Sequence, residues 1–268
     1  MNNFARRSLT AVLFGAVVIG CFLAGRVSFT LLFLLVAFLC LWEFFHLASP
    51  TFSWPEWAGI TLGLLPYLWE SSRHFFSLPW PPDLLVWLLL FSLLGAVLLV
   101  FRPQQTYPLI AWWALGAVYI GLPFFFLWKI AFMSGEYRFG PVFGLLLLIW
   151  ANDTGAYVVG SRFGRRKFFP AVSPNKTWEG VIGGVVLALL AGWGIHALGW
   201  FETLRDGLVL GALAGVMGAV GDLVESSLKR HFQVKDTGAL LPGHGGALDR
   251  FDSLIFLAPW AAGYLLMV

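Results

Sequence analysis

Charged residues, glycine and histidine are concentrated in one stretch near the end of the sequence, residues 226–252. Its aspartates, Asp249 and Asp252, offer the hard oxygen ligands that Mg²⁺ prefers, and its lysines and arginines suit phosphate oxygens. Between them lies a Gly-His-Gly-Gly turn at 243–246, whose backbone N–H groups can face an anion. Together these residue types predict a site for a metal-bound polyphosphate.

The segment that leads into this stretch is predicted to be a helix with a polar face. Four of its residues follow the spacing i, i+3, i+4, i+7, which places them on one side: Asp222, Glu225, Ser226 and Lys229. Asp249 and Asp252 are three residues apart in the first turns of the next predicted helix. We therefore expect the two helices to meet, with Asp222 and Asp249 binding Mg²⁺ between them.

A second polar stretch, residues 173–180, precedes another apolar segment. We predict that Ser173 caps a helix whose first residue is Pro174, because that pairing is favoured at helix starts. Its unpaired N–H groups, beside Lys176 and Thr177, would then form an anion site. The basic run at 162–167 has two interpretations, namely substrate contact or attraction to anionic lipid headgroups.

Two further polar sites lie inside apolar segments. Asp153 lies next to Asn152 in a predicted membrane span, where an ionisable group indicates function by default. The alternative is a structural hydrogen bond between helices. Glu43 and His46 are three residues apart near the end of another span. We interpret them as a polar pair near the membrane interface, with a functional role as the alternative.

Composition indicates an all-α, polytopic integral membrane protein. Hydrophobic residues make up 59% of the 268 and charged residues only 12%, against about 25% in soluble domains. At roughly 20 residues per span, the length allows about nine transmembrane helices. The net charge of +3 is too small to indicate a nucleic-acid partner. Cys21 and Cys40 lie in apolar runs, so we expect neither a disulfide nor a zinc site.

Apolar runs set the expected spans, at about 9–24, 27–47, 57–69, 84–101, 107–132, from 141, 178–198, 205–229 and 247–266. The run at 107–132 is interrupted at Gly121–Pro123 and is either one kinked helix or two pieces. The first run follows two arginines, as in a signal peptide, but another long apolar run follows at once, so we expect a retained span. We divide the chain into N-terminal transmembrane helices, 1–135, and a C-terminal transmembrane catalytic region, 136–268.

Cation counts predict the orientation. With a cytoplasmic N-terminus and nine spans, twelve of the 17 lysines and arginines fall inside: Arg6, Arg7, Arg102, Arg162, Arg165, Arg166, Lys167, Lys176, Lys229, Arg230, Lys235 and Arg250. This bias agrees with the positive-inside rule. It places both polar stretches on the cytoplasmic side of the cell membrane, where nucleotides are available.

The 226–252 stretch also resembles a family signature. Its pattern S-x-L-K-R-x4-K-D-x-G-x2-L-P-x-H-G-G-x-x-D-R-x-D is similar to that of phosphatidate cytidylyltransferases, also called CDP-diglyceride synthetases. The string S-P-N-K-T-x-E-G at 173–180 resembles a second stretch of the same family. One departure is Ala247, where the family usually carries a larger aliphatic side chain, which affects local packing only.

The resemblance implies a reaction in which CTP and phosphatidic acid give CDP-diacylglycerol and pyrophosphate. Residue chemistry alone reaches only metal-dependent phosphoryl or nucleotidyl transfer to a lipid. Three alternatives remain: a CTP- or ATP-dependent lipid kinase, for example of the polyprenol type, an ion-coupled transporter, and a structural membrane subunit. Pyrophosphate release would exclude the kinase, and turnover of CTP would exclude the transporter. A homodimer is left open.

Each candidate residue receives an expected role. The catalytic candidates are Asp222, Asp249, Lys229 and Arg250. Substrate contacts are expected from Ser173, Asn175, Lys176, Thr177, Glu179, Arg230, Lys235, His244, Gly245 and Gly246. The candidate Mg²⁺ ligands, direct or through water, are Asp222, Asp249, Asp252, Asp153 and Glu225.

Overall fold

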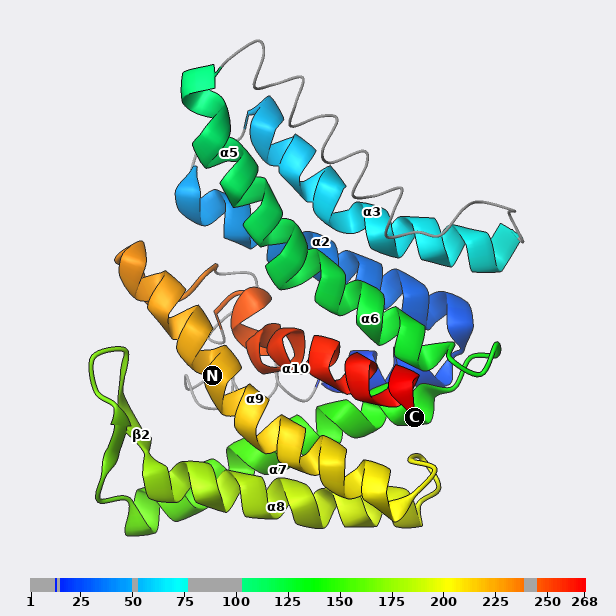
Figure 1. Ribbon diagram of the computed structural model, residues 1–268, viewed down its shortest axis with the longest axis vertical. Coiled ribbons are helices and arrows are strands. Elements are labelled where there is room, and N and C mark those ends of the chain that lie inside the picture. The colour runs from blue at the N-terminus through cyan, green and yellow to red at the C-terminus, as the bar shows by residue number, and fades with distance from the viewer. Residues whose placement is uncertain (1–12, 14, 50–52, 77–102, 239–244) are drawn as a thin grey trace.

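A computed structural model describes residues 13, 15–49, 53–76, 103–238 and 245–268 (Figure 1). The regular elements of these ranges are α2 (Arg26–Ala48), α3 (Trp54–Phe76), α5 (Pro103–Gly116), η1 (Ala117–Gly121), α6 (Leu122–Ala131), α7 (Phe139–Phe163), β1 (Lys167–Phe169), β2 (Ser173–Thr177), α8 (Trp178–Ala197), α9 (Leu204–His231) and α10 (Leu248–Met267). Helices dominate, as the sequence predicts.

Helix lengths and apolar character agree with a multi-pass membrane protein. Within the described ranges, five helices are long and apolar enough to cross a bilayer: α2, the run Pro108–Ala131, α7, α8 and α9. The expected spans at 27–47, 178–198, 205–229 and 247–266 agree closely with α2, α8, α9 and α10. The span expected at 84–101 lies outside the described residues, and that at 9–24 begins outside them.

The interrupted run at 107–132 is one continuous helical path. A single π turn, η1, joins α5 to α6. Gly121 at its end packs directly on the backbone carbonyl of Gly63 in α3, where a Cβ atom would collide. The extra residue of the π turn therefore accommodates Pro123 and a close crossing of two helices.

Helix α3 is longer than the span predicted at 57–69. It continues past Trp69 to Phe76, and its last turns contain Glu70 and Arg73. Glu70 forms ion pairs with Arg73 (3.3 Å) and with Lys129 of α6. The expected span ends before these charged residues, but a carboxylate whose charge is paired can remain within a helix.

Residues 167–177 form an antiparallel β-hairpin, which corrects the predicted helix start at Ser173. Ser173 pairs with Phe169, and Lys167 pairs with Thr177. Pro174 is tolerated because this two-stranded sheet has only edge strands. Helix α8 begins instead at Trp178, with Thr177 as its N-cap accepting from Gly180 N at 3.2 Å.

Glycines allow α8 and α9 to pack closely. A Cβ atom on Gly211 would lie 2.7 Å from the Ala188 carbonyl oxygen, and one on Gly215 would lie 2.7 Å from the Val185 side chain. Small residues at these positions let the two helix backbones approach each other. Helix α10 lies in the interior between α9 and α6, with α7 and α8 beyond α9 (Figure 1). The polar ends of α9 and α10 thereby face each other.

Candidate active site

A cavity of about 420 Å³ opens where α7, the β-hairpin, the start of α8 and the middle of α9 converge. The 173–180 stretch and the helix that leads into the 226–252 stretch both contribute to its wall. Its polar lining consists of Asn152, Asp153, Tyr157, Ser161, Asn175, Lys176, Thr177 and Asp222. Three predicted substrate residues and two predicted metal ligands therefore share one cavity.

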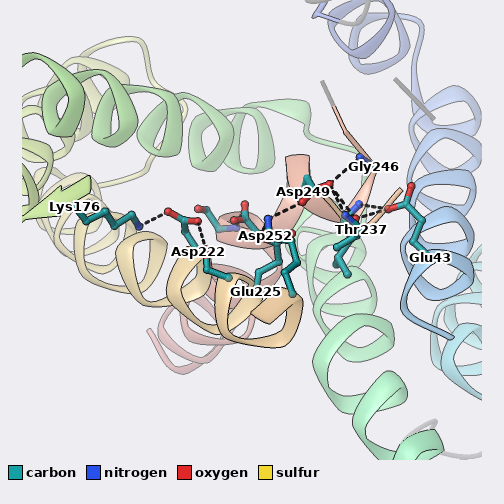
Figure 2. Close-up of polar contacts among 12 residues, drawn as sticks. Glu43, Lys176, Asp222, Glu225, Thr237, Gly246, Asp249 and Asp252 are labelled. Carbon is teal, nitrogen blue, oxygen red and sulfur yellow. Dashed lines mark hydrogen bonds and ion pairs between the residues drawn. The ribbon is translucent and has the colours of Figure 1, made fainter. Parts of the chain in front are cut away.

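Lys176 and Asp222 join the hairpin to α9 at this cavity. Lys176 Nζ forms an ion pair with Asp222 Oδ2 and donates a hydrogen bond to the Ala219 carbonyl at 3.3 Å. Ser226 Oγ donates to the other carboxylate oxygen of Asp222 at 3.3 Å. Figure 2 shows Lys176 and Asp222 at one end of a row of polar side chains. The two stretches are thus linked through Asp222, which the sequence could not establish.

Three carboxylates gather next to this ion pair. Asp222, Glu225 and Asp252 each place an oxygen within 4.8 Å of the others. Glu225 is 1% exposed, and its Oε1 atom has no hydrogen-bond partner among the described residues. A buried oxygen that lacks a donor, beside two further carboxylates, fits a hard divalent cation. This donor set includes three of the five predicted metal ligands.

Lys229 connects this acidic cluster to Asp249. Its Nζ lies 2.6 Å from Glu225 Oε2 and 2.7 Å from Asp249 Oδ1. The side chains of the three residues are 14%, 1% and 5% exposed, respectively. Because one ammonium satisfies two buried carboxylates, it holds α9 and α10 in a fixed relation. Lys229 therefore joins the predicted catalytic groups of two helices.

Asp249 is held from the other side by the loop before α10. Its Oδ2 atom accepts from Thr237 N (2.9 Å), Thr237 Oγ1 (3.1 Å) and Gly246 N (2.8 Å). Gly245 adopts φ +81°, and a Cβ there would lie 2.7 Å from this same oxygen. The described end of the glycine turn, Gly245–Gly246, packs around Asp249, and the Gly246 N–H is directed at this side chain.

Glu179 and Thr177 organise the hairpin. Glu179 accepts from the backbone N–H groups of Arg165 and Arg166 at 3.1–3.3 Å. Trp178 N donates to the Arg166 carbonyl at 2.9 Å. Two of the first three N–H donors of α8, those of Trp178 and Gly180, are therefore paired within the protein. The predicted anion site required free N–H groups at the helix start, and the N–H groups of Trp178 and Gly180 are already paired.

Two residues outside the predicted site extend this network. Glu43 of α2 accepts from Thr237 Oγ1 at 2.9 Å and from the first N–H groups of α10. Figure 2 shows Glu43 and Thr237 at the end of the polar row opposite Lys176. The one sequence signal for Glu43 is a carboxylate near the end of an apolar run, which favours an interfacial pair with His46. Glu43 is instead 1% exposed and bound to α10.

The remaining candidates lie around this centre. Arg230, Lys235 and Arg250 have exposed positions at the end of α9, in the loop after it and at the start of α10, respectively. Ser173 belongs to β2 and is absent from the cavity lining. His244 lies outside the described residues.

Comparison with known proteins identifies the family of this chain. Residues 5–268 match the model of the Cytidylyltransferase family. A phosphatidate cytidylyltransferase of Bacillus subtilis (strain 168) is 35% identical over 262 residues, covering 97% of each chain. One of Staphylococcus saprophyticus is 33% identical over 94% of this chain and 95% of the relative. One of Staphylococcus aureus (strain COL) is 40% identical over 147 residues, 54% of this chain and 55% of the relative. The chain therefore belongs to the cytidylyltransferase family.

Proposed function

We propose that this protein is a phosphatidate cytidylyltransferase, which converts CTP and phosphatidic acid into CDP-diacylglycerol and pyrophosphate. The observation that carries the proposal is the Lys176–Asp222 ion pair. It connects the 173–180 stretch to α9 at the cavity wall, and Ser226, the first residue of the 226–252 stretch, donates to the same Asp222. The chain matches an enzyme of this name over 97% of its length.

Incubation of the purified protein with labelled CTP and phosphatidic acid tests this function directly. Labelled CDP-diacylglycerol and pyrophosphate are expected. Transfer of the terminal phosphoryl group, with release of CDP, would instead identify a lipid kinase. Absence of any turnover, in protein that unfolds cooperatively in detergent, would refute the enzyme and favour the transporter alternative.

The residues around the cavity account for the chemistry that this reaction needs. A phosphate monoester has its second pKa near 6, so the lipid phosphate is already mostly a dianion at neutral pH. The attack on the α-phosphorus therefore requires no strong base. The obstacle is the approach of two anions, and cations such as Lys176, Arg230 and Arg250 reduce that repulsion. Lys229 keeps the adjoining carboxylates in place.

We further propose that Mg²⁺ binds at Asp222, Glu225 and Asp252, with Asp153 on the facing wall of the cavity. The support is the donor set itself, three clustered carboxylates and a buried oxygen with no hydrogen-bond partner in the described part of the chain. When bound, Mg²⁺ would stabilise negative charge on the departing pyrophosphate. Asp249 stays a predicted ligand, although Lys229, Thr237 and Gly246 already contact its oxygens.

The remaining predictions concern assembly and placement. We propose nine transmembrane helices, a division into regions 1–135 and 136–268, and an active site that faces the cytoplasm. The cation distribution supports the orientation. The homodimer stays a prediction that light scattering of the detergent-solubilised protein would test.

A further inference from the structure

Glu43 of α2 and the start of α10 are 204 residues apart in sequence and are joined by hydrogen bonds. Oε1 accepts from Ala247 N at 2.8 Å, and Oε2 accepts from Leu248 N at 2.9 Å. We propose that Glu43 is a positioning residue, which sets the place and orientation of the catalytic groups that α10 carries. The proposal rests on the phosphatidate cytidylyltransferase function proposed above.

The contacts show why a carboxylate is needed at this position. Helix α10 begins without a side-chain cap of its own, because its N-cap residue is Ala247. Its first N–H groups would be orphaned in a buried place, where each unmade hydrogen bond is costly. Glu43 supplies both acceptors, and its negative charge also complements the positive end of the helix dipole. A residue from α2 therefore performs the capping of α10.

Two glycines of the 226–252 stretch make room for this carboxylate. A Cβ atom on Gly246 would collide with Glu43 Oε2, and one on Gly238 would lie 2.6 Å from Oε1. Both glycines are part of the pattern that resembles the family signature. The structure gives one reason for glycine at these two positions. A side chain from another region of the protein, Glu43, packs where a Cβ atom would lie.

Thr237 connects Glu43 to the catalytic groups. Its hydroxyl lies 2.9 Å from Glu43 Oε2 and 3.1 Å from Asp249 Oδ2, and its backbone N–H donates to Asp249. Asp249 in turn binds Lys229, which binds Glu225 of the acidic cluster. The path from Glu43 to the cluster therefore consists of consecutive hydrogen bonds and ion pairs, with Glu43 outside the cavity itself (Figure 2).

The inference predicts that Glu43→Gln retains the fold but loses turnover. An amide has one acceptor oxygen, so its NH₂ group must face one of the backbone donors of α10, and the helix start shifts. We expect kcat to fall about 10–100-fold, as for residues that support the direct ligands of a site. KM for phosphatidic acid should stay at the parental value, because Glu43 makes no contact with the cavity lining.

Glu70→Gln is the matched control. Glu70 is also a nearly buried carboxylate of the N-terminal helices, 8% exposed. Glu70 lies far from Glu43. Its neighbour in α3, Tyr67, donates a hydrogen bond to the Thr30 carbonyl of α2. At 1.5 Å per residue, Thr30 is about 20 Å from Glu43 along that helix. Loss of the ion pairs with Arg73 and Lys129 should lower Tm and leave kcat at the parental value. A merely structural Glu43 would make both variants behave alike.

A double-mutant cycle with Thr237→Val tests the path itself. Because both substitutions break the same connection, their effects on kcat should be less than additive. Full additivity would overturn the proposed path. If Glu43→Gln does not fold, the kcat of Thr237→Val tests the inference by itself. A parental kcat in that variant would refute the inference. A parent protein that forms no CDP-diacylglycerol refutes the proposed function, whereas an active parent with an equally active Glu43→Gln refutes only the positioning role.

Discussion

Lys176 on β2 and Asp222 on α9 form an ion pair at the cavity wall, although 46 residues separate them in sequence. The pair joins a basic hairpin to an acidic cluster. In a phosphatidate cytidylyltransferase, the cation would face the nucleotide phosphates and the anion would face the metal. A metal-bound polyphosphate needs cations for its phosphate oxygens and carboxylates for its metal. The adjacent Lys176 and Asp222 side chains offer one of each.

Lys176→Gln should weaken CTP binding with little loss of stability. The two side chains are 26% and 36% exposed, so the ion pair itself contributes about 0–1 kcal/mol to folding. A lost hydrogen bond to a charged phosphate costs roughly 1.5–3 kcal/mol, or about 10–100-fold in KM for CTP. Arg138→Gln breaks a comparable exposed pair with Glu202 and should leave KM unchanged. Equal KM values in all three proteins would contradict the role of Lys176.

Asn substitutions distinguish the metal ligands from the supporting carboxylate. Asp222→Asn and Asp252→Asn should raise the Mg²⁺ concentration at half-maximal rate by at least about 10–100-fold, because a hard cation prefers a charged oxygen. Asp249→Asn should mainly lower Tm, since its NH₂ group would face Lys229 or the N–H donors of Thr237 and Gly246.

The readouts for these three variants are kcat across a Mg²⁺ titration and thermal unfolding in detergent. A shifted Mg²⁺ midpoint in Asp249→Asn at parental Tm would establish Asp249 as a ligand, as the sequence predicts. Parental rates for both Asp222→Asn and Asp252→Asn at ordinary Mg²⁺ would show that the metal assignment is wrong.

Lys229→Met should strongly destabilise the protein. It leaves Glu225 and Asp249 as buried charges without their shared ammonium, and removal of one partner from a buried pair costs about 3–5 kcal/mol. Lys235→Met, at an exposed position, should change stability by no more than about 0.5 kcal/mol. Chemical denaturation in detergent measures both. Equal stabilities would mean that Lys229 has no structural role between α9 and α10.

Cysteine labelling should place the hairpin and the end of α9 in the cytoplasm. The variants start from protein that lacks Cys21 and Cys40. Exposed positions suit the label, so we choose Ala171 at the hairpin and Lys235 after α9. Gly164 is unsuitable, because a Cβ there would collide with the Gly160 carbonyl. Impermeant reagents should label both from the cytoplasmic side only.

Ser134 provides the control for the opposite side. It is exposed in the turn between α6 and α7, and a cysteine there should react only from outside intact cells. If Ala171→Cys and Lys235→Cys react from outside while Ser134→Cys does not, the predicted orientation is inverted.

The sequence by itself determined the class of protein and the polar face of α9. Few charged residues and long apolar runs require a membrane environment, because so little polar surface cannot be hydrated. The i, i+3, i+4, i+7 spacing of Asp222, Glu225, Ser226 and Lys229 depends only on helix geometry, so α9 has the predicted polar face. The glycines of α9 likewise predict its close packing on α8, because small residues let two helix backbones approach each other.

Only the tertiary structure decided which groups meet. The backbone at 173–177 pairs with 167–169, and strand pairing removed the helix start that Ser173 and Pro174 favour locally. Glu43 resembled an interfacial residue because its donors, Ala247 and Leu248, lie 204 and 205 positions away in the sequence. Its burial becomes favourable only when α10 brings uncapped N–H groups against α2, a contact between distant segments that no local pattern encodes.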